Sequence, residues 1–415
     1  MQSALLQGPP YRNVARCLAE GLPKRLSSKS KENRDAVKQY SENADRALVR
    51  ISGQLRREKF QFLPATGVPQ QRPGKSPRPI VVAPIENRIV QRALLDVLQA
   101  HPPLKPYFEV ATSYGGLKKK GAPDAIEHAY RAMESGANYF IRSDIQGFST
   151  KITKSEVLSV IDGQVSDAKL MELLTAAVAV ELENRAELER LADLFPLYDE
   201  GVAQGSSLSP FLGNIFLNDF DREMNDRGIT CLRYVDDFLL MGPNKSSVLK
   251  TFQSAQKWLA RYSMNAYDPR NDKKKAEMGD ANKGFTFLGC DIHPGQISPS
   301  RDARKRLLNS IEEVLAESER LMNDPKKLAR TRRGLVDTLH EVSNVVRGWG
   351  NQYAFCNNQQ LIDQSDSKIS DRIKRYRAHY SQVLNKLQPA KKPADSRRLL
   401  GVHLLADSKQ KPIAK

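Results

Sequence analysis

Apolar residues recur every three to four positions along several stretches of the chain, a spacing typical of amphipathic helices. The stretches cover residues 85–98, most of 154–195, 247–263 and 301–385. The last of them carries little strand signal, so we expect a separate helical unit there. A basic segment over 24–58 has helical spacing too, and its charges either face solvent or contact nucleic acid.

Short runs of aromatic and β-branched residues predict strands at 78–84, 138–145 and 285–292. A charged segment over 270–283 is expected to be a loop. These short runs alternate with the helical stretches, so the pattern indicates a mixed fold.

Residues 231–242 form the clearest local pattern. Two apolar runs flank Asp236 and Asp237, which predicts a strand-turn-strand hairpin with both carboxylates at the turn. A turn-rich loop over 201–210 precedes this hairpin, and we expect a helix to begin at Pro210.

The charge balance indicates a polyanionic partner. The 415 residues are 40% hydrophobic, but 65 Lys and Arg against 48 Asp and Glu give a net charge of +17. Nucleic acid is therefore the expected partner and a membrane is not, because no run approaches the roughly 20 apolar residues of a spanning helix. With no signal-peptide pattern at the start, we expect a cytoplasmic protein. Its four cysteines form no close sequence pair and are expected to be reduced.

Three carboxylates lie where strands are predicted to end or turn. Asp144 ends the strand at 138–145, whereas Asp236 and Asp237 can share one site only if they occupy the hairpin turn, because neighbouring strand residues point to opposite faces. Transfer of a nucleotide to a 3′-hydroxyl is served by two Mg²⁺ ions about 3.5–4 Å apart, held by carboxylates. We expect Asp144 and Asp236 to be direct ligands and Asp237 to be either a ligand or a turn-shaping residue. Taken alone, Asp-Asp in a turn is more often solvated turn chemistry.

Four blocks, in order along the chain, resemble the bacterial reverse transcriptase family, which includes retron, group II intron-like and defence-associated enzymes. Tyr234-Val-Asp-Asp237 resembles the catalytic motif of that family. The other blocks are Lys75-Ser-Pro-Arg-Pro-Ile80 with Arg88-Ile-Val-Gln-Arg-Ala93, Asp144-Ile-Gln-Gly-Phe148, and Gln204-Gly-Ser-Ser-Leu-Ser-Pro210 with Asn214. The resemblance covers about residues 72–355 and is strongest over 200–243.

The resemblance implies roles for further residues around the incoming nucleotide. Lys75 and Arg78 are expected to bind its triphosphate, for which an ammonium and a guanidinium fork are suited. The implied nucleotide pocket also includes Phe148, Ser149 and Gln204. One lysine of the run 273–275, with Lys275 as our candidate, would lie beside the leaving pyrophosphate.

The resemblance also implies contacts to metal and nucleic acid. The backbone carbonyl of Ile145 would join Asp144, Asp236 and Asp237 in binding two Mg²⁺ ions, with Mn²⁺ as the alternative ion. Arg88 would contact nucleic acid or form a structural ion pair, and the turn Phe287-Leu-Gly-Cys290 would steady the primer end. In a segment resembling the thumb, Trp349 and Tyr353 are either core anchors or residues that stack on a base.

The fold implied by the resemblance is α+β, a right-hand polymerase with fingers, a palm of antiparallel sheet plus helices, and a helical thumb. The expected parts are a basic helical N-terminal extension (1–60), fingers (61–137), the palm with the carboxylates (138–297), the thumb (298–385) and a basic, flexible tail (386–415). We expect neither an RNase H domain nor an endonuclease after the thumb.

The implied activity is RNA-directed DNA polymerase, a nucleotidyltransferase that copies an RNA template into DNA from deoxynucleoside triphosphates. The template is expected to be a structured, companion non-coding RNA, and the role antiphage defence. One departure matters, because many family members place a large aromatic that excludes ribonucleotides where this chain has Ser149; neighbouring Phe148 is the alternative gate. Two other hypotheses are a template-independent or ribonucleotide-tolerant polymerase and a non-catalytic, maturase-like RNA-binding protein.

Overall fold

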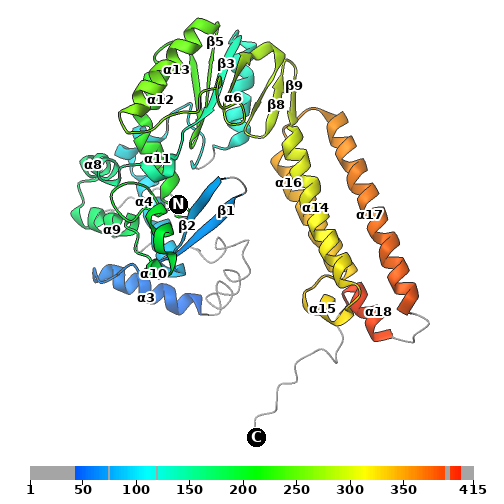
Figure 1. The fold of residues 1–415 in the computed structure, drawn as a ribbon. Helices are drawn as coiled ribbons and strands as arrows, with labels where there is room; N and C mark the ends of the chain where they lie inside the picture. The colour runs from blue at the N-terminus through cyan, green and yellow to red at the C-terminus, as the bar shows by residue number, and fades with distance from the viewer. Residues whose placement is uncertain (1–42, 73–74, 118–119, 388–392, 403–415) are drawn as a thin grey trace. The chain divides into compact units, whose positions relative to one another are not determined.

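The computed structural model of the chain describes residues 43–72, 75–117, 120–387 and 393–402. The chain divides into two compact units, Met1–Asp280 and Ala281–Lys415, and each is described by itself (Figure 1). Within the described ranges, no helix combines the length and apolar character needed to cross a membrane.

A four-stranded antiparallel sheet, in the order β4-β5-β3-β6, organises the first unit. Its strands are β3 (Tyr139–Asp144), β4 (Thr230–Tyr234), β5 (Asp237–Gly242) and β6 (Glu277–Asp280). The β4–β5 hairpin keeps one register along its length and ends with Tyr234 opposite Asp237. Because β3 runs antiparallel to β5, Asp144 pairs with Asp237 at the same end of the sheet.

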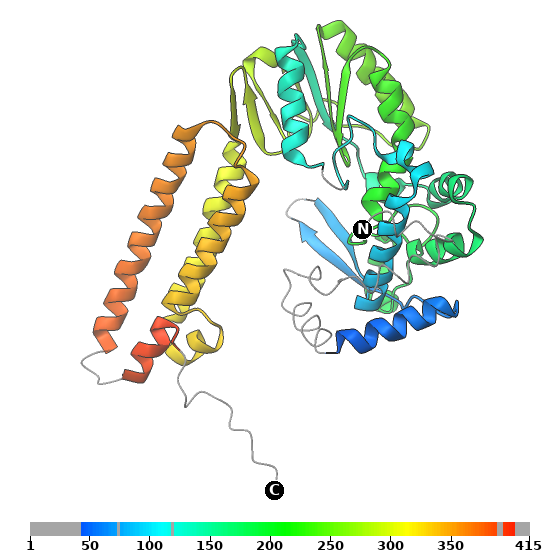
Figure 2. The same cartoon turned by 180° about the vertical axis from the view of Figure 1, so that it is seen from behind.

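Helices cover both faces of this sheet. α13 (Lys245–Ala260) packs on β3 and β5, α12 (Asn218–Asn225) on β4, and α6 (Ala122–Glu134) on β4 and β5. Figures 1 and 2 show α6 on the face opposite α12 and α13. Residues 238–241 of β5 are fully buried as a result, which explains their unbroken apolar run in the sequence.

An antiparallel ribbon and further helices complete the first unit. The ribbon pairs β1 (Thr66–Arg72) with β2 (Lys75–Val82). The helices are α3 (Ala44–Arg56), α4 (Ile85–Ala100), α5 (Lys105–Phe108), α7 (Phe148–Lys151), α8 (Lys154–Val165), α9 (Ala168–Val178), α10 (Arg185–Leu188) and α11 (Ser209–Phe216), with 3-10 turns η4 (Pro102–Leu104) and η5 (Glu189–Leu194). One large core joins α4, α8, α9 and α11 to the sheet.

The second unit combines a small antiparallel sheet with long helices. Its elements are η6 (Ala281–Lys283), β7 (Phe285–Phe287), β8 (Cys290–His293), β9 (Gln296–Pro299), α14 (Arg301–Leu321), α15 (Pro325–Arg330), α16 (Leu335–Gln352), α17 (Gln359–Leu387) and α18 (Pro393–Leu400). A separate core lies among these helices, where the hydroxyls of Ser318 and Tyr376 are 2.8 Å apart and both residues are fully buried.

Most of the predicted elements are confirmed. α4 covers the helical stretch 85–98, β3 covers most of 138–145, and the hairpin turns at Asp236. α11 begins at Ser209, with Pro210 in its first turn. The predicted limits of extension, fingers, palm and thumb stay predictions, and residues 1–42 of the extension lie outside the described residues.

Two strand predictions were wrong in detail. The single strand expected over 285–292 is a hairpin, because Leu288 and Gly289 have φ angles of 47° and 82° and reverse the chain between β7 and β8. β6 lies inside the segment expected to be a loop. Its short polar sequence has no strand pattern, and pairing with β3 defines it.

The flexible tail predicted over 386–415 is wrong where the structure describes it. α17 runs to Leu387, and α18 packs against α15, α16 and α17. Leu399 of α18 is fully buried, and the mostly buried Arg398 pairs with Asp395 at 2.9 Å. The surrounding basic residues obscured this apolar anchor in the sequence. Residues 388–392 and 403–415 lie outside the described residues.

The structure places three of the four cysteines, whose reduced state stays a prediction. Cys231, Cys290 and Cys356 are free thiols, and Cys17 lies outside the described ranges. The Sγ atoms of Cys290 and Cys356 nevertheless lie 4.0 Å apart, a proximity that their separation in sequence did not suggest.

Candidate active site

The strand register brings three carboxylates to one end of the four-stranded sheet. Asp144 is the last residue of β3, and Asp237, the first residue of β5, is its direct partner across the strands. Asp236 lies in the turn between β4 and β5, where its carbonyl accepts a hydrogen bond from the Ile145 N–H at 3.0 Å. The backbone thus ties the hairpin turn to the end of β3.

The turn itself has an unusual backbone conformation. Val235 has a φ of 61°, in the left-handed region that β-branched residues strongly disfavour. Gly115 lies against this residue so closely that a Cβ atom at position 115 would be 2.5 Å from Val235 Cγ2 and 2.6 Å from its N. Such a conformation persists only when surrounding contacts hold it, so the turn is positioned by its neighbours.

Burial and the repulsion of neighbouring carboxylates raise the pKa values of Asp236 and Asp237. Burial, together with the charges of Asp144 and Asp236, raises the pKa of Asp237 to about 6. Burial also raises the pKa of Asp236, again with a contribution from Asp144. Crowded carboxylates of this kind favour a nearby cation, which would stabilise their ionised forms.

Lys275 supplies one positive charge at this cluster. Its Nζ forms an ion pair with Oδ2 of Asp144 and lies 5.4 Å from the centre of the Tyr267 ring. Burial lowers the pKa of Lys275, but the hydrogen bond and the charge of Asp144 outweigh burial, so the pKa is raised. Lys273 and Lys274 are exposed, whereas Lys275 is half-buried at the carboxylates; its role beside the leaving pyrophosphate stays a prediction.

The carboxylate and carbonyl oxygens at the cluster are donors that suit Mg²⁺. In this structure, however, the carboxylates are not arranged around a common metal position. In the described part of the chain, no three His, Cys, Asp or Glu side chains stand close enough to hold a metal. Asp144 is paired with Lys275 instead. Metal binding by Asp144, Ile145, Asp236 and Asp237 stays a prediction, and it requires Lys275 to move away from Asp144.

The raised pKa of Asp237 predicts that the metal-free protein loses stability as pH rises. The folded pKa of about 6 lies above the ordinary value of 3.8, so the native state holds more protons between these values. The free energy of unfolding in EDTA should therefore fall by on the order of 1–3 kcal/mol from about pH 4 to pH 6.5. Urea denaturation at each pH measures the free energy of unfolding. In Asp237→Asn, most of its fall with pH should disappear. An unchanged pH profile in Asp237→Asn would contradict the prediction.

The nucleotide-pocket candidates Arg78 and Gln204 lie together. The Arg78 Nε donates to Oε1 of Gln204, and the backbone N–H of Val81 donates to the Gln204 carbonyl at 2.9 Å. Gly205 permits this close approach, because it has a φ of 123° and a Cβ there would lie 2.7 Å from the Val81 carbonyl oxygen. The side chain of Lys75 lies outside the described residues.

Neither Phe148 nor Ser149 is placed as an aromatic that excludes ribonucleotides would be. Phe148 is 3% exposed and packs in the core, its ring centre 6.4 Å from that of Phe216. A Cβ on Gly213 would lie 2.9 Å from the Phe148 ring, so helix α11 packs directly against this ring. Ser149 is half-buried, and its carbonyl accepts a hydrogen bond from the Val202 N–H at 2.7 Å. Phe148 could reach a nucleotide only by leaving its core position.

The candidates for nucleic-acid contact are divided between the two units. Arg88 is half-buried in the first turns of α4. Trp349 and Tyr353 belong to the second unit, where their ring centres are 4.7 Å apart. Tyr353 is only 6% exposed, which favours the core-anchor alternative for this residue.

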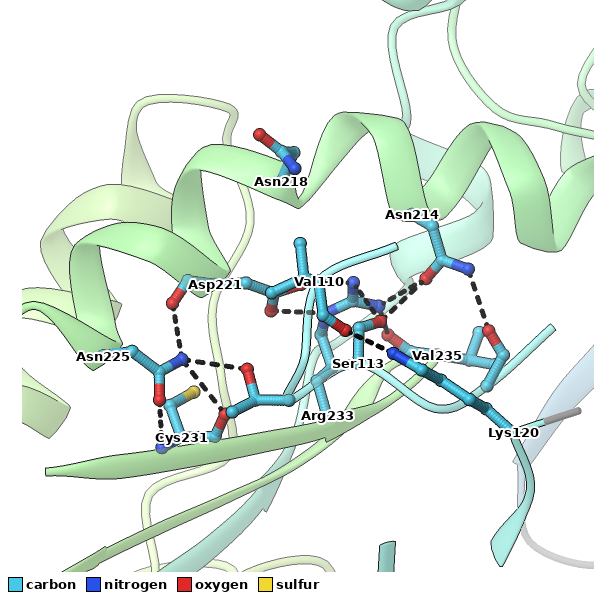
Figure 3. Close-up of polar contacts among 12 residues, drawn as sticks. Val110, Ser113, Lys120, Asn214, Asn218, Asp221, Asn225, Cys231, Arg233 and Val235 are labelled. Atoms are coloured by element: carbon cyan, nitrogen blue, oxygen red, sulfur yellow. Dashed lines mark hydrogen bonds and ion pairs between the residues drawn. The ribbon is translucent and has the colours of Figure 1, made fainter. Parts of the chain in front are cut away.

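A buried polar network behind the turn was not predicted from the sequence. Figure 3 shows Arg233 of β4 with Asp221, Asn214, Ser113 and Val235. Nε and Nη2 of Arg233 donate to the two Asp221 carboxylate oxygens at 2.7 and 2.6 Å, and both side chains are essentially unexposed. The available signal was an arginine inside an otherwise apolar strand, because a fully buried arginine requires a partner.

A sequence model of one protein family matches more than half of the chain. Residues 70–292 match the family described as reverse transcriptase (RNA-dependent DNA polymerase). This range includes the three carboxylates, Lys275 and the network around Arg233.

Curated relatives share limited identity with the chain. Protein YkfC of Escherichia coli K12 is 23% identical over 271 residues, which are 55% of this chain and 67% of YkfC. The group II intron-encoded protein LtrA of Lactococcus lactis is 26% identical over 149 residues, 36% of this chain and 23% of LtrA. The chain thus spans about two thirds of one relative and only about a quarter of the other.

Solved structures with similarity include apo telomerase from Candida tropicalis, with a TM-score of 0.39 and 15% identity over 82% of this chain and 69% of that one. A partial Cas6-RT-Cas1–Cas2 complex gives a TM-score of 0.32 and 19% identity over 62% of this chain and 42% of that one.

Proposed function

Because this chain belongs to the reverse transcriptase (RNA-dependent DNA polymerase) family, we propose that it extends a 3′-hydroxyl with deoxynucleotides along an RNA template. The observation that carries the proposal is the meeting of Asp144 with Asp236 and Asp237 at one end of the four-stranded sheet. A non-catalytic scaffold has no need to crowd three carboxylates when burial, together with their mutual repulsion, raises the pKa of two of them.

The carboxylates Asp144, Asp236 and Asp237 would hold two Mg²⁺ ions, with the Ile145 carbonyl as a further oxygen donor. When bound, such ions activate the attacking hydroxyl and stabilise charge on the leaving group. Lys275, released from Asp144, would place its ammonium near the leaving pyrophosphate. Arg78 is held beside Gln204 and offers a guanidinium to the triphosphate.

A primer-extension assay tests the proposal. The full chain is incubated with a primed RNA template, Mg²⁺ and either deoxy- or ribonucleoside triphosphates, with an untemplated primer as the parallel reaction. Template-dependent deoxynucleotide incorporation is the expected result. Binding of the primed RNA with no incorporation under any condition would favour the non-catalytic, maturase-like alternative.

A second candidate function is a ribonucleotide-tolerant polymerase. The positions of the Phe148 and Ser149 side chains favour it. The core position of Phe148 leaves the small Ser149 at the place where many relatives carry a large aromatic. Neither side chain, as placed here, presents a ring to a ribose 2′-hydroxyl.

Substitution of Ser149 tests this candidate. Ser149→Phe should lower ribonucleotide incorporation about tenfold or more relative to deoxynucleotide incorporation, because a ring would occlude the 2′-hydroxyl. The ratio of kcat/KM values for the two sugars measures it. Ser149→Ala is the matched control, since it removes the hydroxyl without adding a ring. If both variants keep the ratio of the unmodified enzyme, position 149 is not the gate.

We further propose that the template is a structured, companion non-coding RNA and that the activity serves antiphage defence. This proposal rests on the resemblance to the bacterial family that includes retron and defence-associated enzymes, and on the net charge of +17, which suits a folded polyanion. Sequencing the nucleic acid that co-purifies with the chain tests it. Recovery of one defined RNA species is expected, whereas a random sample of cellular RNA would contradict it.

A further inference from the structure

We propose that Arg233 is a positioning residue, which holds the carbonyl of Val235 and thereby fixes the turn that presents Asp236 to Asp144. The inference rests on the proposed polymerase function, because it assigns a task to a residue behind the same carboxylates. Arg233 is 1% exposed, so it contacts neither template nor nucleotide and would act only through the turn.

The contacts of Arg233 use its full donor capacity. A guanidinium has five N–H donors, and each has an acceptor here. Two donate to Asp221, one to the Asn214 Oδ1 at 2.9 Å, one to the Ser113 Oγ at 2.9 Å, and one to the Val235 carbonyl at 3.0 Å. The Val235 contact is the one that reaches the catalytic turn, and the other four fix the orientation of the guanidinium that makes it.

The network also holds the segment that packs against the turn. The Asn214 Nδ2 donates to the Gly115 carbonyl at 2.8 Å, and the backbone of 112–114 bonds to both the N–H and the carbonyl of Arg233. Gly115 in turn lies against Val235. Val235 is therefore held on one side by a hydrogen bond to its carbonyl and on the other by Gly115.

The conformation of Val235 explains why the contacts from Arg233 and Gly115 matter for the position of the carboxylates. A valine at a φ of 61° tends to return to the extended or right-handed region, which would rotate the peptide leading into Asp236. The Asp236 carbonyl must stay in line with the Ile145 N–H for the turn to meet β3. Arg233 opposes that rotation by keeping the Val235 carbonyl pointed into the protein.

Arg233→Lys tests the proposal, because a lysine keeps the charge opposite Asp221 but has no fork to reach all four partners. We expect Mn²⁺ binding, measured by electron paramagnetic resonance, to weaken about 10–100-fold, and kcat to fall in the same range with nearly unchanged KM. The matched control is Asn225→Ala. Asn225 bonds Asp221, Thr112 and Cys231 in the same region but not Arg233 or the turn. Equal losses in the two variants at equal melting temperature would overturn the proposal.

A rescue experiment isolates the turn conformation. Glycine adopts a positive φ without a steric penalty, so Val235→Gly should need less support from Arg233. In the Val235→Gly background, Arg233→Lys should therefore cost much less Mn²⁺ affinity than in the unmodified background. Equal costs in both backgrounds would mean that Arg233 does not act through Val235.

A second variant covers the case in which Arg233→Lys does not fold. The double substitution Arg233→Met with Asp221→Leu replaces the buried pair by apolar side chains, a change that often preserves stability. Its melting temperature should be close to that of the unmodified chain. It should still bind Mn²⁺ about 10–100-fold more weakly. Unaltered Mn²⁺ binding in this folded variant would overturn the proposal.

Metal binding and activity are read separately in these experiments. If the unmodified chain binds Mn²⁺ but incorporates no nucleotide, the proposed function fails. The Mn²⁺ affinities of the variants then still decide whether Arg233 positions the turn. If the unmodified chain polymerises and Arg233→Lys matches it in both readouts, only the positioning role fails.

Discussion

Asp236→Asn is expected to lower kcat for deoxynucleotide incorporation at least ~10³-fold, because losing a metal-ligating charge removes several kcal/mol of transition-state stabilisation. Asparagine keeps the volume and the backbone bond to Ile145, so the fold should be retained. Steady-state incorporation on a primed RNA template measures the loss. RNA affinity, followed by fluorescence anisotropy, should change little, because phosphate contacts come from Lys and Arg side chains.

Asp226→Asn is the matched control for this substitution. Asp226 caps the end of α12, is exposed, and lies outside the carboxylate cluster. It should retain activity within about twofold, as surface substitutions usually do. If Asp236→Asn polymerises as well as Asp226→Asn, the assignment of Asp236 as a metal ligand is wrong.

Asp221→Ala should produce the largest loss of stability. The substitution leaves the Arg233 guanidinium buried without its carboxylate partner, which costs about 3–5 kcal/mol. Burial raises the pKa of Asp221 and the Arg233 charge opposes that rise, so the bidentate pair depends on both members. Urea denaturation followed by circular dichroism measures the change in the free energy of unfolding.

Glu223→Ala, two residues further along α12, provides the comparison for Asp221→Ala. Glu223 pairs with Arg227 at 3.1 Å, but both side chains are more than a third exposed. Solvent screening limits such a pair to below about 1 kcal/mol. Similar losses in Asp221→Ala and Glu223→Ala would show that the buried pair adds no more than a surface pair.

The sequence predicted the fold best where local pattern and local structure coincide. The helix α4 follows from apolar spacing, and the hairpin follows from two apolar runs around Asp236 and Asp237. Prediction failed where tertiary contacts oppose the local pattern. β6 is a polar segment that pairs with β3, and α18 is a basic segment anchored by Leu399.

The sequence by itself determined the family, the three carboxylates and their places at a strand end and in a turn, because motif and periodicity are properties of neighbouring residues. Only the tertiary structure decided that Lys275 pairs with Asp144, that Phe148 lies in the core, and that Arg233 holds Val235. Each of these joins segments far apart in the chain. Such a contact depends on how strands and helices pack, and the direction of a side chain in that packing leaves no trace in local spacing.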